Sequence, residues 1–218
     1  MTDNEILRQR MVDSQVRTWD VTDRPLIDAF LEIPRERFVT GAQLPFAYSD
    51  MELPIDGSGR TLVAPALLAR MIQALEIAKD EVVMDLGCGR GYSAALLGRL
   101  AEAVVAVEPD DDLRHAAETN MAALKIDNVA VVEGSLTEGY PAEGPYDAIL
   151  IAAGAEIVPS ALFDQLAEDG RLAVVERNGE FGRMKVFTRT GEHVSGRAVV
   201  DAAAPVLPGF QRKREFVF

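Results

Sequence analysis

The clearest pattern in the chain lies between residues 81 and 176, where short apolar runs alternate with segments of helical periodicity. Apolar residues recur every three or four positions in the helical segments, whereas the apolar runs have the length of strands. Such alternation predicts an α/β fold, a doubly wound, mostly parallel sheet with helices on both faces. Helices are expected at 92–100, 111–124 and 160–168, between strands at 81–87, 103–108, 129–133, 147–153 and 171–176.

The N-terminal region is predicted to be helical at first and irregular afterwards. Helices are expected over residues 3–17 and, after Asp23, over residues 24–32. Residues 35–60 contain prolines and glycines without clear periodicity, which predicts an irregular segment rather than a strand pair. Segments of this kind often carry the substrate side of a site. Pro65 is expected to begin the next helix.

The C-terminal region is predicted to contain strands only. The helical pattern stops after Gly182, and antiparallel strands that close one edge of the sheet are expected near residues 184–189, 196–201 and 214–218. A chain of 218 residues can bury a sizeable core, so one domain is expected. Its parts would be N-terminal helices with a loop, a ligand-binding core and C-terminal strands, at residues 1–60, 61–182 and 183–218.

One stretch, from Val83 to Tyr92, combines an apolar run, a carboxylate and three glycines at alternate positions. This order is typical of a strand, a tight turn and the N-terminus of a helix. Glycine permits a sharp turn and close approach of a ligand to the main chain. The unpaired N–H groups at the start of a helix suit an anionic ligand group. The stretch therefore predicts a nucleotide-type site, at the carboxyl ends of the central strands.

A second acid strengthens this interpretation. Glu108 ends the predicted strand at 103–108, roughly 20 residues after the glycines, which is the spacing at which a carboxylate reaches the ribose hydroxyls. An adenosyl ligand is therefore expected. Dinucleotide enzymes carry Gly-x-Gly-x-x-Gly, whereas here Asp85 precedes Gly87, Gly89 and Gly91. That order resembles the first motif of S-adenosylmethionine-dependent methyltransferases, in which the glycines line the methionine end of the cofactor.

Charge and composition limit the classes of partner that the chain is expected to bind. The net charge of −13 and the pI near 4.6 disfavour nucleic acid and anionic membranes. The basic cluster at residues 212–214 is interpreted as a solvated strand edge. The single cysteine, Cys88, excludes an internal disulfide and fits a reducing compartment. Because no signal peptide or apolar run of transmembrane length is visible, the protein is expected to be cytoplasmic.

No metal site is expected from the sequence. His115 lies in a predicted helix, where it is interpreted as solvated, and His193 is expected in a turn. Two isolated histidines and Cys88 do not form a recognisable set of metal ligands. The small side chain of Cys88 within the glycine turn is sufficient reason for its position.

Short motifs over nearly the whole chain match one known family. They are Met11-Val12-x-x-Gln15, Ile33-Pro34-Arg35-Glu36-Arg37-Phe38-Val39, Ala47-Tyr48-x-Asp50, Leu53-Pro54-Ile55, Gly59-Arg60-Thr61, the glycine turn, Pro145-Tyr146-Asp147 and Gln165-Leu166-x-x-x-Gly170-Arg171-Leu172. The chain thereby resembles the protein-L-isoaspartate O-methyltransferases. The resemblance implies a Rossmann-like methyltransferase that uses S-adenosylmethionine and releases S-adenosylhomocysteine. Its partners would be proteins or peptides that contain isoaspartyl residues, whose carboxylate it would methylate as a step of protein repair.

The motifs and the resemblance together predict the residues of the site. The acceptor side is expected to be formed by Arg60, Thr61 and Val63. The cofactor-binding residues are expected to be Asp85, Gly87, Cys88, Gly89, Gly91, Tyr92, Glu108, Pro109, Gly134 and Ser135.

The chain departs from the family pattern at two places. The family loop reads approximately Gly-Gln-Thr-Ile-Ser-x-Pro, with a serine that helps to hold the substrate carboxylate, and Val63 stands at that serine's position. The family also has Gly-Asp-Gly after the third strand, with an acid that faces the adenine amine, where this chain has Gly134-Ser135-Leu136. Ser135 can still accept a hydrogen bond, but a neutral acceptor is weaker than a charged one.

Arg60 stands where the resemblance leads one to expect glutamine, and two interpretations stay open. Its guanidinium could hold the substrate carboxylate, so that a cationic side chain replaces the missing hydroxyl. Alternatively, Arg60 is a surface residue or pairs with a local acid such as Asp56.

Three functions remain open at this point. The first is methylation of isoaspartyl residues with a modified substrate loop. The second is methylation of another carboxylate or a small molecule on the same fold. The third is a catalytically weak regulatory module that binds S-adenosylmethionine or keeps only the fold. Val63 favours the second and third, whereas the intact segment from Pro34 to Pro54 favours the first.

Overall fold

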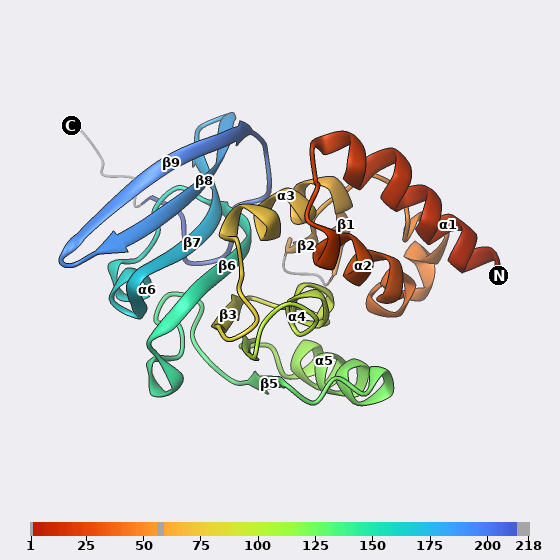
Figure 1. Ribbon diagram of the computed structural model, residues 1–218, viewed down its shortest axis with the longest axis horizontal. Helices are drawn as coiled ribbons and strands as arrows, with labels where there is room; N and C mark the ends of the chain where they lie inside the picture. Colours follow the sequence, from red (N-terminus) through yellow and green to blue (C-terminus); the bar gives the residue numbers. More distant parts are fainter. Residues whose placement is uncertain (1, 56–58, 213–218) are drawn as a thin grey trace.

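The structure is a computed structural model that describes residues 2–55 and 59–212. Its main sheet has seven strands: β3 (Val82–Leu86), β4 (Ala103–Val107), β5 (Val129–Val132), β6 (Tyr146–Ala155), β7 (Leu166–Asn178), β8 (Phe181–Thr190) and β9 (His193–Asp201). They lie in the order β5-β4-β3-β6-β7-β8-β9 (Figure 1). All pairs from β5 to β7 are parallel, and β7–β8 and β8–β9 are antiparallel. The predicted α/β fold class is therefore confirmed.

Helices cover the sheet. Helix α3 (Pro65–Leu75) leads into β3, and parallel strands are connected by α4 (Tyr92–Leu97), α5 (Asp111–Leu124) and α6 (Ser160–Asp164). The residues of β3 and β4 are almost all buried, as expected for apolar strands that are covered on both faces. The helix α5 begins at a defined cap, because the side chain of Asp110 accepts a hydrogen bond from Leu113 N.

The strand order determines where a ligand can bind. From β3 the chain runs through α4 to β4 and through α5 to β5, and it then returns to β6 on the other side of β3. The order therefore reverses between β3 and β6. In open α/β sheets, ligands bind outside the carboxyl ends of the strands at such a reversal. The glycine turn that follows β3 lies at this edge.

The N-terminal helices pack together beside the sheet, away from the β8–β9 hairpin (Figure 1). Helix α1 (Asp3–Met11) continues through a π-helical turn, Val12–Val16, and a 3-10 turn, Arg17–Trp19, so the predicted helix at 3–17 is not a regular α-helix throughout. Helix α2 (Arg24–Glu32) has the predicted bounds. Buried residues of both helices share one hydrophobic cluster with α3 and α4. The division of the chain into three parts stays a prediction.

The segment at 35–60 contains short 3-10 helices and one strand. The 3-10 helices are Arg35–Phe38 and Gly41–Phe46. Strand β1 (Leu53–Pro54) pairs antiparallel with β2 (Thr61–Leu62). The expectation of no strand pair was therefore wrong here. With only two residues on each strand and a proline in β1, the pair is too short to produce an alternating pattern in the sequence.

Two predicted helices are shorter than expected. The helix at 92–100 ends at Leu97, before a glycine. The helix at 160–168 ends at Asp164, because β7 begins at Leu166 and pairs with the first residue of β6.

In the C-terminal region, the strands expected at 184–189 and 196–201 lie within β8 and β9. His193 is the first residue of β9 rather than part of a turn, so that prediction was wrong. The strand expected at 214–218, and most of the basic cluster at 212–214, lie outside the described residues.

Candidate functional site

The loop between β3 and α4 bends through three glycines with left-handed backbone. Gly87, Gly89 and Gly91 have φ angles of +75°, +58° and +90°, which side chains disfavour. A Cβ on Gly91 would lie 2.9 Å from Met121 Cε and 3.2 Å from Ala117 Cβ. Glycine at this position therefore allows the loop to pack against α5. As the sequence predicts, the turn joins the end of β3 to the first turn of α4.

Asp85 lies at the carboxyl end of β3 and is buried. Ser93 Oγ donates a hydrogen bond of 2.6 Å to Asp85 Oδ2. Asp85 Oδ1 is also buried, and it has no hydrogen-bond partner among the described residues. Burial raises the pKa of Asp85 to about 7, while the Ser93 hydrogen bond lowers it and the nearby charge of Glu108 raises it. The site thus contains a buried acceptor with one oxygen available to a donor.

The raised pKa of Asp85 is expected to make the stability of the fold depend on pH. Between the usual pKa of 3.8 and about 7, the folded chain holds the proton that the unfolded chain has lost. Stability therefore falls as pH rises through this range, by up to about 1.4 kcal/mol per pH unit. Urea unfolding curves across the range should show this fall for wild type relative to Asp85→Asn. The matched control is Asp80→Asn, at an exposed aspartate, and parallel curves for wild type and Asp85→Asn would contradict the prediction.

Glu108 directly follows β4, and its carboxylate contacts the glycine loop. The residue is fully buried. Gly89 N donates to Glu108 Oε2 at 2.8 Å, and Asp110 N donates to Glu108 Oε1 at 3.1 Å. Because Asp110 also caps α5, the turn that begins this helix fixes the carboxylate beside the loop. The structure therefore brings together the loop and the acid that the sequence singles out. That Glu108 binds ribose stays a prediction.

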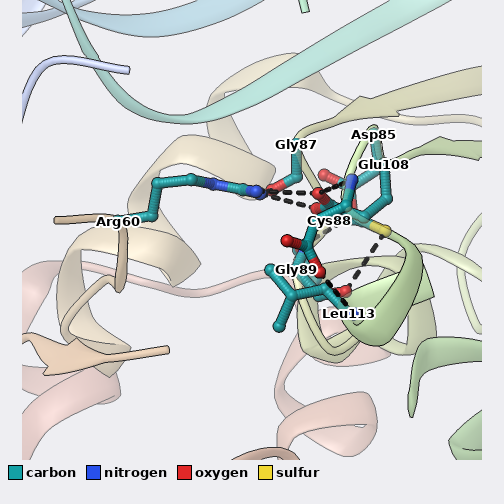
Figure 2. Close-up of polar contacts among 9 residues, drawn as sticks. Arg60, Asp85, Gly87, Cys88, Gly89, Glu108 and Leu113 are labelled. Carbon is teal, nitrogen blue, oxygen red and sulfur yellow. Dashed lines mark hydrogen bonds and ion pairs between the residues drawn. The ribbon is translucent and has the colours of Figure 1, made fainter. Parts of the chain in front are cut away.

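Arg60 forms a bidentate ion pair with Glu108 (Figure 2). Its Nη1 lies 2.7 Å from Glu108 Oε1, and its Nη2 lies 2.6 Å from Glu108 Oε2. Nη2 also donates to the carbonyl of Gly87 at 3.2 Å. Arg60 is 7% exposed, so the interpretation of Arg60 as a surface residue was wrong. Asp56, the other suggested partner, lies outside the described residues. No local pattern in the sequence indicates the pairing of Arg60 with Glu108, because the two residues are far apart in the sequence.

Two adjoining pockets flank the glycine loop. Both are lined by Ile55, Thr61, Gly87 and Ala152. Only the first is lined by Val63 together with Cys88, Gly89 and Tyr92. Only the second is lined by Gly59, Arg60 and the segment 205–207. The predicted acceptor residues and the glycine loop therefore share one cavity region. Ile55, Ala152 and the segment 205–207 also line it and were not predicted as site residues.

A buried arginine holds the acceptor side of this region in place. Arg35 is 0% exposed, and it donates from Nε to the carbonyl of Ala47 at 2.9 Å and from Nη2 to the carbonyl of Val63 at 2.8 Å. Its guanidinium carbon lies 4.8 Å from the centre of the Tyr92 ring. Arg35 thus links the N-terminal segment, the Val63 loop and the start of α4. Arg35 lies in one of the motifs that resemble the family, but the motif alone does not reveal that this arginine is buried.

Cys88 is a buried residue of the glycine loop whose thiol is not activated. Burial, followed by the charges of Asp85 and Glu108, raises the pKa of the Cys88 thiol well above its usual value, and Arg60 lowers it. The neutral thiol is therefore the stable form. This agrees with the interpretation of Cys88 as a small residue that fits the turn.

The remaining predicted cofactor residues lie beyond β4 and β5. Pro109 separates Glu108 from the cap of α5. A Cβ on Gly134 would lie 2.7 Å from Val107 Cγ1, so glycine allows the loop after β5 to approach β4. Ser135 is exposed, and its Oγ lies 3.1 Å from the Thr137 hydroxyl. It lines neither of the two pockets. Its role toward the adenine stays a prediction.

Neither a metal centre nor a membrane span emerges from the described part of the chain. Within residues 2–55 and 59–212, no three His, Cys, Asp or Glu side chains are grouped as metal ligands. His115 has a side chain that is 84% exposed. In the same residues, every helix is too short or too polar to cross a bilayer.

Comparison with known proteins assigns the family. A model of the protein-L-isoaspartate(D-aspartate) O-methyltransferases matches residues 7–204. The chain belongs to this family. It is 41% identical over 204 residues to a protein-L-isoaspartate O-methyltransferase of Koribacter versatilis, with 94% of this chain and 91% of the relative covered. The corresponding enzyme of Roseiflexus castenholzii is 35% identical over 203 residues, with 93% and 92% covered.

Solved structures agree with this assignment. One protein-L-isoaspartate O-methyltransferase superposes with a TM-score of 0.81 at 30% identity, and the match covers 93% of this chain and 66% of that chain. A Plasmodium falciparum structure of the same description, in complex with S-adenosyl-L-homocysteine, has a TM-score of 0.78 at 21% identity and covers 95% and 99%. At 21% identity, the similarity to the Plasmodium falciparum structure supports the fold alone. The predicted family, fold and methyltransferase class are confirmed.

Proposed function

We propose that this member of the protein-L-isoaspartate O-methyltransferase family transfers a methyl group from S-adenosylmethionine to the free carboxylate of L-isoaspartyl residues in damaged proteins. The observation that carries the proposal is the family match over residues 7–204, which includes the loop with Arg60, Thr61 and Val63 as well as the glycine loop. The experiment that tests it is methylation of an isoaspartyl peptide beside its aspartyl control.

The residues around the glycine loop fit the cofactor. Asp85 Oδ1 is a buried acceptor with no partner among the described residues, which suits the amino group of a methionine moiety. The left-handed glycines let the main chain turn sharply at the start of α4, beside the pocket that Gly87 and Gly89 line. Glu108 would accept hydrogen bonds from the ribose hydroxyls, and Pro109, Gly134 and Ser135 would lie toward the adenine. S-adenosylmethionine would supply a methyl group on a reactive sulfonium and leave as S-adenosylhomocysteine.

Calorimetry can test this assignment without any acceptor. S-adenosylmethionine and S-adenosylhomocysteine are expected to bind, whereas NAD and ATP are not. Binding of NAD without any response to S-adenosylhomocysteine would remove the methyltransferase interpretation of the loop.

The chemistry requires alignment more than acid–base catalysis. A carboxylate is already ionised near neutral pH, so the chain must place it in line with the donor and exclude water. Thr61 and Val63 line the pocket beside the glycine loop, and Phe38, Leu62 and Leu68 make much of its remaining wall apolar. Such a wall limits the access of water to the acceptor.

Val63→Ser is expected to increase turnover on an isoaspartyl peptide. Val63 supplies an apolar wall where the family pattern has a serine that helps to hold the substrate carboxylate. A lost hydrogen bond of this kind costs roughly 1–3 kcal/mol, so restoring it should raise kcat/KM by about fivefold or more. Steady-state kinetics with a saturating donor measure this.

Val63→Ala is the matched control for this substitution. It removes the same methyl groups without adding a hydroxyl, so kcat/KM should not rise. Because Val63 is buried, both variants are expected to lose some stability, and the melting temperature should be recorded for each. An equal or lower kcat/KM in Val63→Ser, with S-adenosylhomocysteine binding intact, would count against the assignment of this position.

The partners are proposed to be isoaspartyl-containing proteins and peptides. The net charge of −13 disfavours nucleic acid and anionic membranes as partners. A cytoplasmic location remains a prediction from the sequence.

A further inference from the structure

The guanidinium of Arg60 pairs with the carboxylate of Glu108, to which the ribose hydroxyls are expected to donate. Glu108 accepts four hydrogen bonds, two from Arg60 and one each from Gly89 N and Asp110 N. Both carboxylate oxygens are therefore already engaged by Arg60, in a fully buried position. A ribose cannot donate to the same lone pairs while Arg60 holds them. Cofactor binding at Glu108 must therefore displace or reposition Arg60.

We propose that Arg60 exchanges between two carboxylates: it pairs with Glu108 before the cofactor binds, and it holds the acceptor carboxylate once the ribose hydroxyls engage Glu108. This inference rests on the proposed function. In this exchange, Arg60 couples the cofactor site to the acceptor site. The substrate carboxylate would then be held by Arg60 rather than by the serine that Val63 replaces.

The two partners of Arg60 in the exchange are both carboxylates. A guanidinium is a planar fork of donors that fits any carboxylate, whether it belongs to Glu108 or to an isoaspartyl residue. Two neighbouring ribose hydroxyls can replace the two Arg60 donors on Glu108. The carboxylate also keeps its bonds to Gly89 N and Asp110 N, so its charge remains partly compensated.

The position of Arg60 supports its proposed contact with the acceptor carboxylate. Arg60 directly precedes Thr61, which lines both pockets, and it lies three residues before Val63. Its Nη2 lies 3.5 Å from where a Cβ on Gly87 would be, at the wall that the two pockets share. Because Gly87 lines both pockets, the guanidinium already lies beside the cavity region where the acceptor is proposed to bind.

The exchange predicts a specific linkage between ligands. Because Arg60 competes with ribose, the pairing lowers the apparent affinity for the cofactor. Because the cofactor releases Arg60 toward the acceptor, each of the two ligands should strengthen the binding of the other.

Calorimetry on the full chain tests the competition at Glu108. Arg60→Gln and Arg60→Met should each bind S-adenosylhomocysteine at least tenfold more tightly than wild type, although both lower the melting temperature. The Arg60→Gln/Glu108→Gln double variant should not bind more tightly than Glu108→Gln alone. A merely structural role for Arg60 would instead weaken binding and stability together, and equal or weaker affinity in both single variants would overturn the competition.

A matched pair of small ligands tests whether the competition involves the ribose. The gain in affinity of Arg60→Gln should appear for adenosine and vanish for 2′,3′-dideoxyadenosine, which lacks both hydroxyls. An equal gain for the two ligands would overturn the assignment of the ribose as the competitor.

Kinetics test the transfer of Arg60 to the acceptor. With a saturating donor, Arg60→Gln should raise KM for an isoaspartyl peptide at least tenfold with a smaller change in kcat, and Arg60→Lys should recover part of this loss. An unchanged KM would overturn the transfer. If wild type does not methylate isoaspartyl peptide at all, the proposed function and the transfer to that carboxylate both fail, while the affinity for S-adenosylhomocysteine still decides the competition at Glu108.

Discussion

Glu108→Ala is expected to lower the free energy of unfolding by about 3–5 kcal/mol, because it leaves the buried guanidinium of Arg60 without its carboxylate. Gly89 N and Asp110 N would also lose their acceptor. Binding of S-adenosylhomocysteine should weaken by about 1–3 kcal/mol as the hydrogen bonds to the ribose are lost. Urea unfolding and calorimetry measure the two effects.

Glu133→Ala is the matched control for this substitution. Glu133 directly follows β5 as Glu108 follows β4, but its side chain is 76% exposed and lies 4.0 Å from the nearest cation, Arg114. Its replacement should change stability by no more than about 0.5 kcal/mol. If Glu108→Ala were equally harmless, the ion pair with Arg60 would not stabilise the fold and the account of the site would be wrong.

Arg35→Met is expected to destabilise the chain by about 3 kcal/mol or more and to weaken the acceptor side of the site. The substitution leaves the buried carbonyls of Ala47 and Val63 without donors, and each unsatisfied group costs about 1–3 kcal/mol. It also removes the contact of the guanidinium with the Tyr92 ring. Arg35→Lys should not restore stability, because one ammonium cannot reproduce the planar fork that reaches both carbonyls.

Arg37→Met provides the control in the same 3-10 helix. Arg37 is exposed, so its replacement should change the free energy of unfolding by less than about 0.5 kcal/mol. Chemical denaturation of the three variants in parallel measures this. A loss for Arg35→Met no greater than that for Arg37→Met would show that the bonds from Arg35 do not hold the loop.

The parts of the fold that carry clear local signals, such as helix caps and continuous apolar runs, were predicted from the sequence. Helix α2 has the predicted bounds because Asp23 caps it and Pro25 fixes its first turn. The strands before the glycine turn and before Glu108 were predicted because they are continuous apolar runs, as buried parallel strands are. The β1–β2 pair was missed because pairs of two residues leave no periodicity.

The cofactor side of the site was predicted because its residues follow strands whose order in the sheet can be inferred from the sequence. The glycine turn and Glu108 lie at the ends of adjacent parallel strands, so their approach followed from the strand order. The contacts of Arg60 and Arg35 join segments that are distant in the sequence, and no local pattern indicates them. Arginines are mostly exposed, so the interpretation of Arg60 as a surface residue, one of the two left open, followed a general rule that its buried carboxylate partner overrides.

Methyl transfer to a synthetic peptide that contains one L-isoaspartyl residue tests the central claim most directly. The full chain is incubated with S-adenosylmethionine labelled on its methyl group, beside the same peptide with an ordinary aspartyl residue in that place. The account predicts labelled methyl ester on the isoaspartyl peptide and none above background on the aspartyl control. Equal labelling of the two peptides, or no labelling of either by a chain that binds S-adenosylhomocysteine, would contradict it.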